Sequence, residues 1–171
     1  MLLFLAPLFG AVACASLPPS PDAVARVDLA RYAGTWYEIA RFPNRFQRDC
    51  FGSTATYTLR PDGRVTVVNE CRKGGADGPL SSVRGTARVV DPQTNAKLKV
   101  TFFWPFSGDY WIIDLGEQYE YAVVSGPDRK YLWILCRTPA MDPDRYRALV
   151  ASLQTRGFDV GRLIGAARED P

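Results

Sequence analysis

The strongest constraint on the fold is a series of short segments in which apolar and polar residues alternate. These segments are rich in β-branched and aromatic residues, and turn-forming residues separate them, which predicts strands. The connections are too short to hold a helix, so neighbouring strands must run antiparallel. We expect eight strands, over residues 36–41, 51–60, 64–71, 80–90, 97–104, 110–115, 119–125 and 131–136. Eight such strands can close into an up-and-down β-barrel without a free edge.

The pattern changes to a helical period after Pro139. Asp142 is a suitable N-cap, Pro143 a suitable first helical residue and Gly157 a suitable terminator. Between them, apolar residues recur at helical spacing, at Tyr146, Leu149, Val150 and Leu153. We therefore expect an all-β fold, an eight-stranded antiparallel barrel with one C-terminal α-helix, residues 142–155, packed on its outside.

The composition excludes several function classes. The 171 residues suit one domain, and 47% of them are hydrophobic, which is enough for a packed core. Histidine is absent, which removes Ser-His-Asp and Cys-His catalysis and histidine-ligated zinc. The formal net charge of +3 is not concentrated in a run of Lys and Arg, which argues against nucleic-acid binding. We expect no metal and no cofactor.

The N-terminal segment predicts export. Residues 1–13 form an uncharged apolar stretch that is shorter than the ~20 residues of a membrane-spanning helix and fits a signal peptide. The small residues before Cys14 resemble a bacterial lipobox, whose cysteine is acylated after cleavage; an ordinary signal peptide is the alternative. No Asp follows the cysteine directly, so we expect anchoring at the outer membrane, facing the periplasm. An extended tether over 14–26 then leads to a barrel domain over 27–171.

Three motifs add a family resemblance. Gly34-Thr35-Trp36 resembles the Gly-x-Trp signature that opens the first strand of lipocalins. Tyr119-Glu120-Tyr121 resembles the start of the second lipocalin motif, and Arg137 after the last strand resembles the third. Over roughly Val27 to Gly157 the chain is therefore similar to lipocalins, most of all to bacterial outer-membrane lipoprotein lipocalins of the apolipoprotein D type.

The resemblance implies a structural role for the first and third motifs. It places Gly34 and Trp36 at the closed end of the barrel, with Arg137 packed across the indole in a cation–π contact worth roughly 0.5–2 kcal/mol. Glu38 and Arg41 are charges within the first strand, and a buried charge needs a partner. Arg137 is one candidate partner for Glu38, and exposure of Glu38 to solvent is the other possibility.

The resemblance also implies that the barrel interior binds a ligand. Strand alternation and the apolar residues near the mouth and wall give the candidate lining: Phe42, Ala55, Tyr57, Leu59, Val65, Val67, Phe102, Trp104, Phe106, Tyr110, Ile112 and Trp133. This lining favours a fatty acid, a lysophospholipid or a similar small hydrophobic ligand, at ~0.8 kcal/mol for each buried CH₂. The alternative is that these side chains fill the barrel completely.

A meander places alternate connections at the same end of the barrel. The longer connections, where a ligand is expected to enter, are 42–50, 72–79, 105–109 and 126–130. The tight turns at the opposite end are 61–63, 91–95 and 116–118. Trp104 and Phe106 lie at the rim formed by the longer connections and are candidates for contact with a bilayer if Cys14 is acylated.

Cys50 and Cys71 lie at the same expected rim, at the start and the end of consecutive strands. Counted from the turn at Asp62, they are about three residues, or ~10 Å, out of register, so a disulfide between them needs a bulge. Export to an oxidising compartment favours the bridge. Cys136 is then unpaired, either as a small buried residue under the helix or as a nucleophile.

The leading functional hypothesis is a non-enzymatic protein that stores or transports lipids at the bacterial cell envelope, as a monomer or weak dimer. One alternative is a lipocalin-fold enzyme with a cavity thiol, although no base accompanies Cys136. The other is a binder of a rigid pigment such as haem or a retinoid-like molecule. Haem would need Tyr or Cys ligation because histidine is absent.

Overall fold

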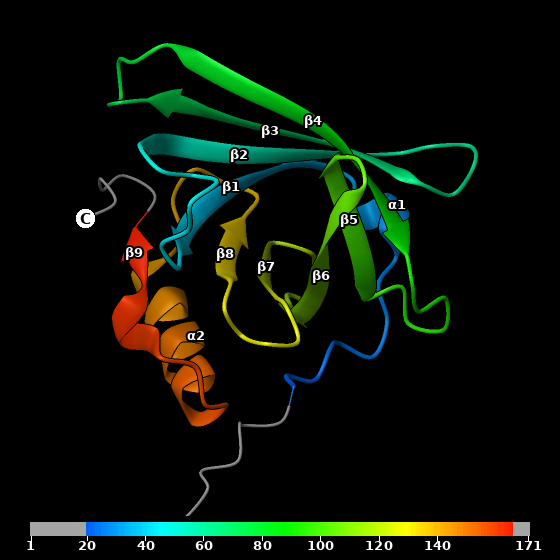
Figure 1. The fold of residues 1–171 in the computed structure, drawn as a ribbon. Coiled ribbons are helices and arrows are strands. Elements are labelled where there is room, and N and C mark those ends of the chain that lie inside the picture. Colours follow the sequence, from blue (N-terminus) through cyan, green and yellow to red (C-terminus); the bar gives the residue numbers. More distant parts are fainter. Residues whose placement is uncertain (1–19, 166–171) are drawn as a thin grey trace, which may run out of the picture.

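The predicted strands close into a barrel. The computed structural model describes residues 20–165, so the expected signal peptide and Cys14 lie outside the described residues. Strands β2 to β8 pair in sequence order, and β1 pairs with both β2 and β8, which closes an antiparallel ring (Figure 1). The eight strands are β1 Gly34–Arg41, β2 Cys50–Leu59, β3 Val65–Lys73, β4 Leu80–Val89, β5 Lys97–Phe103, β6 Phe106–Leu115, β7 Tyr121–Ser125 and β8 Leu132–Cys136.

A bulge in β1 determines which of its side chains face the interior. The first half of β1 pairs with β2 and the second half with β8, and the register with β8 shifts between Glu38 and Ala40. The extra residue interrupts the alternation of side chains. Glu38 and Arg41 therefore lie on the same inner side although they are three residues apart, whereas Ala40 packs on the outside.

The helix α2 (Pro143–Thr155) covers one outer face of the barrel, as predicted. The Asp142 carboxylate accepts a hydrogen bond from the Arg145 backbone N at 2.9 Å and caps the first turn. The buried side chains of α2 pack on the outward residues of four strands, namely Ala40, Ile113, Val123, Leu132 and Ile134. A 3-10 helix η1 (Val160–Arg162) then leads to a two-residue strand β9 (Ile164–Gly165) that pairs with β1.

A short helix that the sequence analysis did not predict, α1 (Leu29–Tyr32), covers one end of the barrel. The side chain of Asp28 accepts hydrogen bonds from two backbone N–H groups of α1 and caps it. The chain before α1 lies along the barrel wall, where the backbone N of Val24 donates to Ile112 O at 2.9 Å. Residues 20–26, which belong to the expected tether, are thus held against the barrel in part.

The ends of the barrel differ in their connections. The closed end carries α1 and the turns 60–64, 90–96 and 116–120. The opposite end, called the open end below, carries the loops 42–49, 74–79 and 126–131 and the turn 104–105. Within residues 20–165, no helix combines the length and apolar character that crossing a membrane requires.

The limits of β6 differ from the prediction. Residues 105–109 were expected to form a connection, but β6 begins at Phe106, which pairs with Phe103 across the cis Trp104–Pro105 bond. The Pro and Gly residues there suggested a longer loop. Pro105 occupies the turn itself, and Gly108 continues the ladder opposite Val100, so the connection is only two residues long.

Candidate functional site

Trp36 and Arg137 seal the closed end of the barrel, and the expected stacking is present. The Arg137 guanidinium lies 3.9 Å from the indole centroid, and Trp36 is fully buried with its Nε1 donating to Tyr32 O at 2.9 Å. Arg137 also donates to the carbonyls of Arg31, Ala33 and Thr35 at 2.7, 2.9 and 3.0 Å. Gly34 has φ +96°, and a Cβ there would lie 3.2 Å from Arg137 Nη1, so the close approach favours glycine.

Three tyrosines meet inside the barrel just above this seal. The hydroxyl of Tyr110 on β6 lies 2.7 Å from that of Tyr32 on α1 and 2.9 Å from that of Tyr57 on β2. Burial raises the pKa of Tyr57 to about 12 and raises the pKa values of Tyr32 and Tyr110 well above the ordinary value. The tyrosine triad therefore stays protonated at neutral pH and links opposite walls of the barrel.

A small cavity adjoins the tyrosine triad. Its lining residues are Leu29, Tyr32, Tyr57, Val65, Ala87, Leu98, Val100 and Tyr110. Its volume is about 10 Å³, which is close to the space that one water molecule needs. Around the triad, side chains therefore fill nearly all of the barrel interior in this structure.

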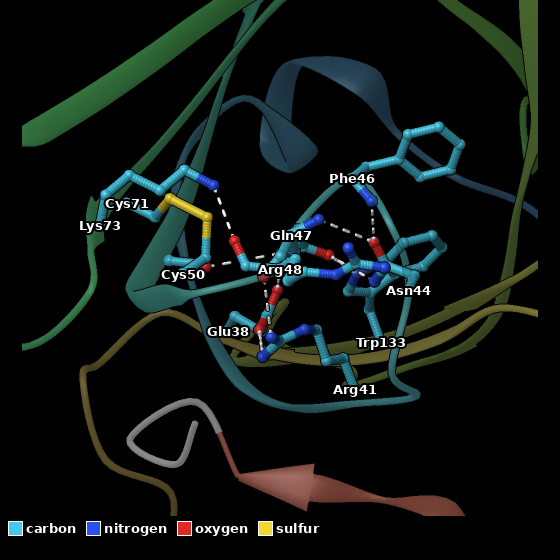
Figure 2. Close-up of a disulfide and its surroundings, with 11 residues drawn as sticks. Glu38, Arg41, Asn44, Phe46, Gln47, Arg48, Cys50, Cys71, Lys73 and Trp133 are labelled. Carbon is cyan, nitrogen blue, oxygen red and sulfur yellow. Dashed lines mark hydrogen bonds and ion pairs between the residues drawn. A yellow bond between two sulfur atoms is a disulfide. The ribbon is translucent and has the colours of Figure 1, made fainter. Parts of the chain in front are cut away.

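A buried polar cluster lies inside the barrel toward the open end. Arg41 Nη1 donates to Glu38 Oε1 at 3.1 Å, and their side chains are 0% and 4% exposed. The side chain of Gln47 extends the cluster, because its Nε2 donates to Glu38 Oε2 at 2.5 Å and its Oε1 accepts from Trp133 Nε1 at 2.7 Å. Figure 2 shows Gln47 among these three side chains. Arg137 is therefore not the partner of Glu38: the β1 bulge brings Arg41 to it instead.

The predicted disulfide is confirmed. Cys50 and Cys71 have a Cα–Cα distance of 5.4 Å and form an S–S bond beside the loop 42–49 (Figure 2). The ladder between β2 and β3 shifts in register between Phe51 and Thr54, which is the irregularity that the sequence offset required. The disulfide thus joins two strands next to the segment that carries Gln47.

Most candidate lining residues meet in one apolar cluster inside the barrel. They are Ala55, Tyr57, Val65, Val67, Phe102, Tyr110, Ile112 and Trp133. The same cluster contains residues that the sequence analysis did not name, among them Tyr32, Ala87, Leu98 and Val100. Strand alternation was sufficient to predict Leu98 and Val100, whereas Tyr32 belongs to a helix that left no clear signal.

The other four candidate lining residues lie elsewhere. Phe42 packs in the outer cluster under α2, with the Arg162 guanidinium 4.5 Å from its ring, because the β1 bulge turns it outward. Leu59 is 40% exposed at the end of β2. Trp104 and Phe106 are 88% and 77% exposed at the tip of the β5–β6 hairpin, beyond the part of the barrel that encloses an interior.

Cys136 is the one cysteine outside the disulfide among residues 20–165. Cys136 is buried, but it continues the outward-facing series of β8, and its Sγ lies 3.3 Å from Thr138 Oγ1. The thiol therefore does not face the interior. Across residues 20–165, His, Cys, Asp and Glu side chains form no group of three or more that is suited to a metal ion.

Sequence comparison decides the family. Residues 27–168 match the family described as the lipocalin-like domain. The chain belongs to the lipocalin family. This lipocalin is 45% identical over 159 residues to outer membrane lipoprotein Blc of Escherichia coli (strain K12), covering 91% of this chain and 89% of that protein. It is 32% identical over 181 residues to apolipoprotein D of Mus musculus, covering 95% and 92% of the two chains.

Solved structures show the same fold. Insecticyanin from the tobacco hornworm Manduca sexta superposes on this lipocalin with a TM-score of 0.68, at 21% identity, covering 90% of this chain and 86% of that one. The outer-membrane lipoproteins among the relatives support a lipid-anchored localisation at the outer membrane. That localisation agrees with the apolar stretch and the cysteine that the sequence places at positions 1–14.

Proposed function

We propose that this lipocalin binds a fatty acid, a lysophospholipid or a similar lipid inside the barrel, and that it stores or transports this lipid at the bacterial cell envelope. The observation that carries the proposal is the apolar inner face, on which Val67, Ile112 and Val124 are almost completely buried from three different strands. An inner face of this kind suits an acyl chain, since it offers contact without a requirement for hydrogen bonds.

The energetics favour such a ligand. Each CH₂ group removed from water contributes about 0.8 kcal/mol, so a chain of about sixteen carbons gains on the order of 10 kcal/mol before the costs of association and ordering. A net gain of about 8 kcal/mol corresponds to micromolar affinity. Apolar contact therefore supplies a gross gain of the size that micromolar binding needs, from which the costs of association and ordering are still to be subtracted.

The proposal requires the interior to expand. Ligand pockets typically measure about 300–1,000 Å³, far more than the 10 Å³ beside the tyrosine triad. Phe102 is a side chain whose movement creates room, because its ring packs against Gly85 and is partly exposed. Toward the open end, Gln47 is held to Trp133 by a hydrogen bond that an entering ligand must displace.

Native mass spectrometry of protein purified gently from its host tests the proposal. We expect a co-purified acyl lipid whose mass identifies it. Ala55→Trp fills the interior and should abolish the bound lipid, since Ala55 packs against the interior cluster. Thr58→Trp is the matched control on the same strand, because Thr58 is exposed and should leave the lipid in place. Equal lipid content in both variants contradicts binding inside the barrel.

A further inference from the structure

The large apolar side chains that the barrel exposes most strongly lie at its open end. Phe103, Trp104 and Phe106 are 72%, 88% and 77% exposed and surround the β5–β6 turn. Phe46 in the loop 42–49 and Leu80 at the start of β4 are 63% and 62% exposed at the same end. We call these five residues the apolar rim. Burial of Trp and Phe is favourable, so exposure of several together at one end indicates a surface that contacts an apolar partner.

The closed end has a different surface. Its most exposed large apolar side chains among the described residues are Leu59 and Val90, at 40% and 39%, and neither is aromatic. The asymmetry shows that the apolar rim is not a general property of the strand ends. It is confined to the end where a ligand is expected to enter.

Basic residues accompany the apolar rim. The loop 42–49 contains the cations Arg45 and Arg48 and the acid Asp49. The end of β3 and the loop 74–79 before Leu80 contain the cations Arg72 and Lys73 and the acid Asp77. The Arg45 guanidinium lies 5.1 Å from the Phe46 ring, so charge and aromatic surface are adjacent. Aromatic residues with flanking cations suit the interface of a membrane with anionic headgroups.

We propose that the apolar rim inserts into the surface of a bilayer that contains anionic lipid, as a second membrane contact besides the expected acyl anchor. The length of the N-terminal segment permits both contacts at once. Asp22 O accepts a hydrogen bond from Arg156 Nη2 at 3.3 Å, and the same Nη2 donates to Ile113 O at 2.9 Å, so Asp22 is held beside Ile113. Eight residues from Cys14 to Asp22 span up to about 26–29 Å when extended, and β6 covers about 23 Å from Ile113 to Phe106. An anchor at Cys14 can therefore reach the membrane surface that the rim enters.

This orientation has a functional consequence. With the open end against the bilayer, a lipid passes between membrane and barrel without exposing its acyl chain to water. The membrane contact does not depend on ligand binding, so the two proposals can fail separately.

Vesicle binding by the unacylated chain tests the contact. A chain that begins at Ala15 lacks the cysteine and retains the whole described fold. We expect it to bind vesicles of phosphatidylcholine with phosphatidylglycerol more strongly than vesicles of phosphatidylcholine alone. Trp104→Ser/Phe106→Ser should weaken binding about tenfold or more, and Leu59→Ser/Val90→Ser at the closed end should change it less than about twofold.

Charge reversal supplies an independent variant. Arg45→Glu/Arg48→Glu should remove the preference for anionic vesicles, while Arg60→Glu/Arg64→Glu at the closed end should retain it. Fluorescence of Trp104, obtained as the difference from Trp104→Phe, should shift to the blue when vesicles are added.

Three results would overturn the proposal. The first is a chain that does not bind vesicles, and the second is equal loss of binding after substitution at either end. The third is a dimer in solution that Trp104→Ser/Phe106→Ser converts to a monomer with vesicle binding unchanged, which would assign the apolar rim to a second copy of the chain. Binding of a fluorescent fatty acid to each variant is measured separately, so that the lipid-binding proposal is tested independently of vesicle binding.

Discussion

The guanidinium of Arg137 and the indole of Trp36 are stacked 3.9 Å apart, and this one contact brings the end of β8, the start of β1 and α1 together. Residues about a hundred positions apart in sequence therefore complete the closed end jointly. Arg137 also donates hydrogen bonds to the backbone carbonyls of Arg31, Tyr32 and Ala33. These carbonyls at the end of α1 have no helical N–H partner. The closed end is for this reason a structural unit, and the proposed ligand exchange is assigned to the open end.

Replacement of Arg137 tests the closed end. Arg137→Leu removes the cation–π contact and the hydrogen bonds to α1, and we expect the free energy of unfolding to fall by about 2–4 kcal/mol. Arg145→Leu is the control, since the Arg145 guanidinium lies 5.3 Å from the Tyr121 ring centroid on the surface. This replacement should lower the free energy of unfolding by less than about 1 kcal/mol. Urea unfolding measures both values; equal values would show that Arg137 is an ordinary surface cation.

The buried pair of Glu38 and Arg41 should behave as a unit. Glu38→Leu leaves the Arg41 guanidinium in the barrel without its carboxylate, and we expect a loss of about 3–5 kcal/mol. The double variant Glu38→Leu/Arg41→Leu should lose less than the sum of the two single variants. A double-mutant cycle from urea unfolding gives the coupling, and strict additivity would contradict the pair.

The tyrosine triad predicts a loss of stability in alkali. The pKa of Tyr57 is about 12 in the folded protein against an ordinary value of 10, so the unfolded chain releases this proton first as pH rises. The contribution of the triad to the free energy of unfolding is fully present below pH 10. It falls between pH 10 and about pH 12, by up to about 1.4 kcal/mol per pH unit for each such tyrosine.

Tyr57→Phe should make this alkaline slope shallower by the contribution of one tyrosine, up to about 1.4 kcal/mol per pH unit. Tyr37→Phe, on the outer face of β1, is the matched control and should leave the contribution of the triad in place. Urea unfolding at intervals above pH 10, in a Cys136→Ser background that prevents thiol exchange, measures the slopes. Identical slopes for the two variants would argue against the buried triad.

The disulfide should stabilise the fold at the open end. Cys50 and Cys71 are separated by 21 residues, and closing a loop of this size contributes about 3 kcal/mol in the chain-entropy account. We expect Cys50→Ala/Cys71→Ala to lower the urea midpoint and to make it insensitive to a reducing agent. The urea midpoint of Cys136→Ala should still fall when a reducing agent is added. A wild-type midpoint unchanged by reduction would show that the bridge contributes little.

Local patterns predicted much of the fold. Alternation gave the strands, and the N-cap Asp142 with Pro143 gave α2, because these signals arise from residues close together in sequence. The Gly34–Trp36 motif and Arg137 were sufficient to predict the seal of the closed end once the family resemblance was available. The disulfide followed from the position of its cysteines at one rim.

The remaining features depend on contacts that no local pattern encodes. A single bulged residue in β1 turns Arg41 inward and Phe42 outward, and the alternation of the sequence gives no sign of it. Gln47 becomes part of the interior only because the loop 42–49 folds back over Glu38. The four-residue α1 is too short for a helical period to be recognised, although it supplies Tyr32 to the triad.

Methyl NMR titration with palmitate tests most directly whether a lipid occupies the barrel. The probes are the methyl groups of Val67, Val100 and Ile112 inside the barrel and those of Val123 and Ile134 on its outer face under α2. We predict saturable shifts and contacts with the acyl chain at the inner probes and almost none at the outer probes. Saturation without shifts at Val67, Val100 and Ile112, or contacts at the outer probes instead, would contradict lipid binding inside the barrel.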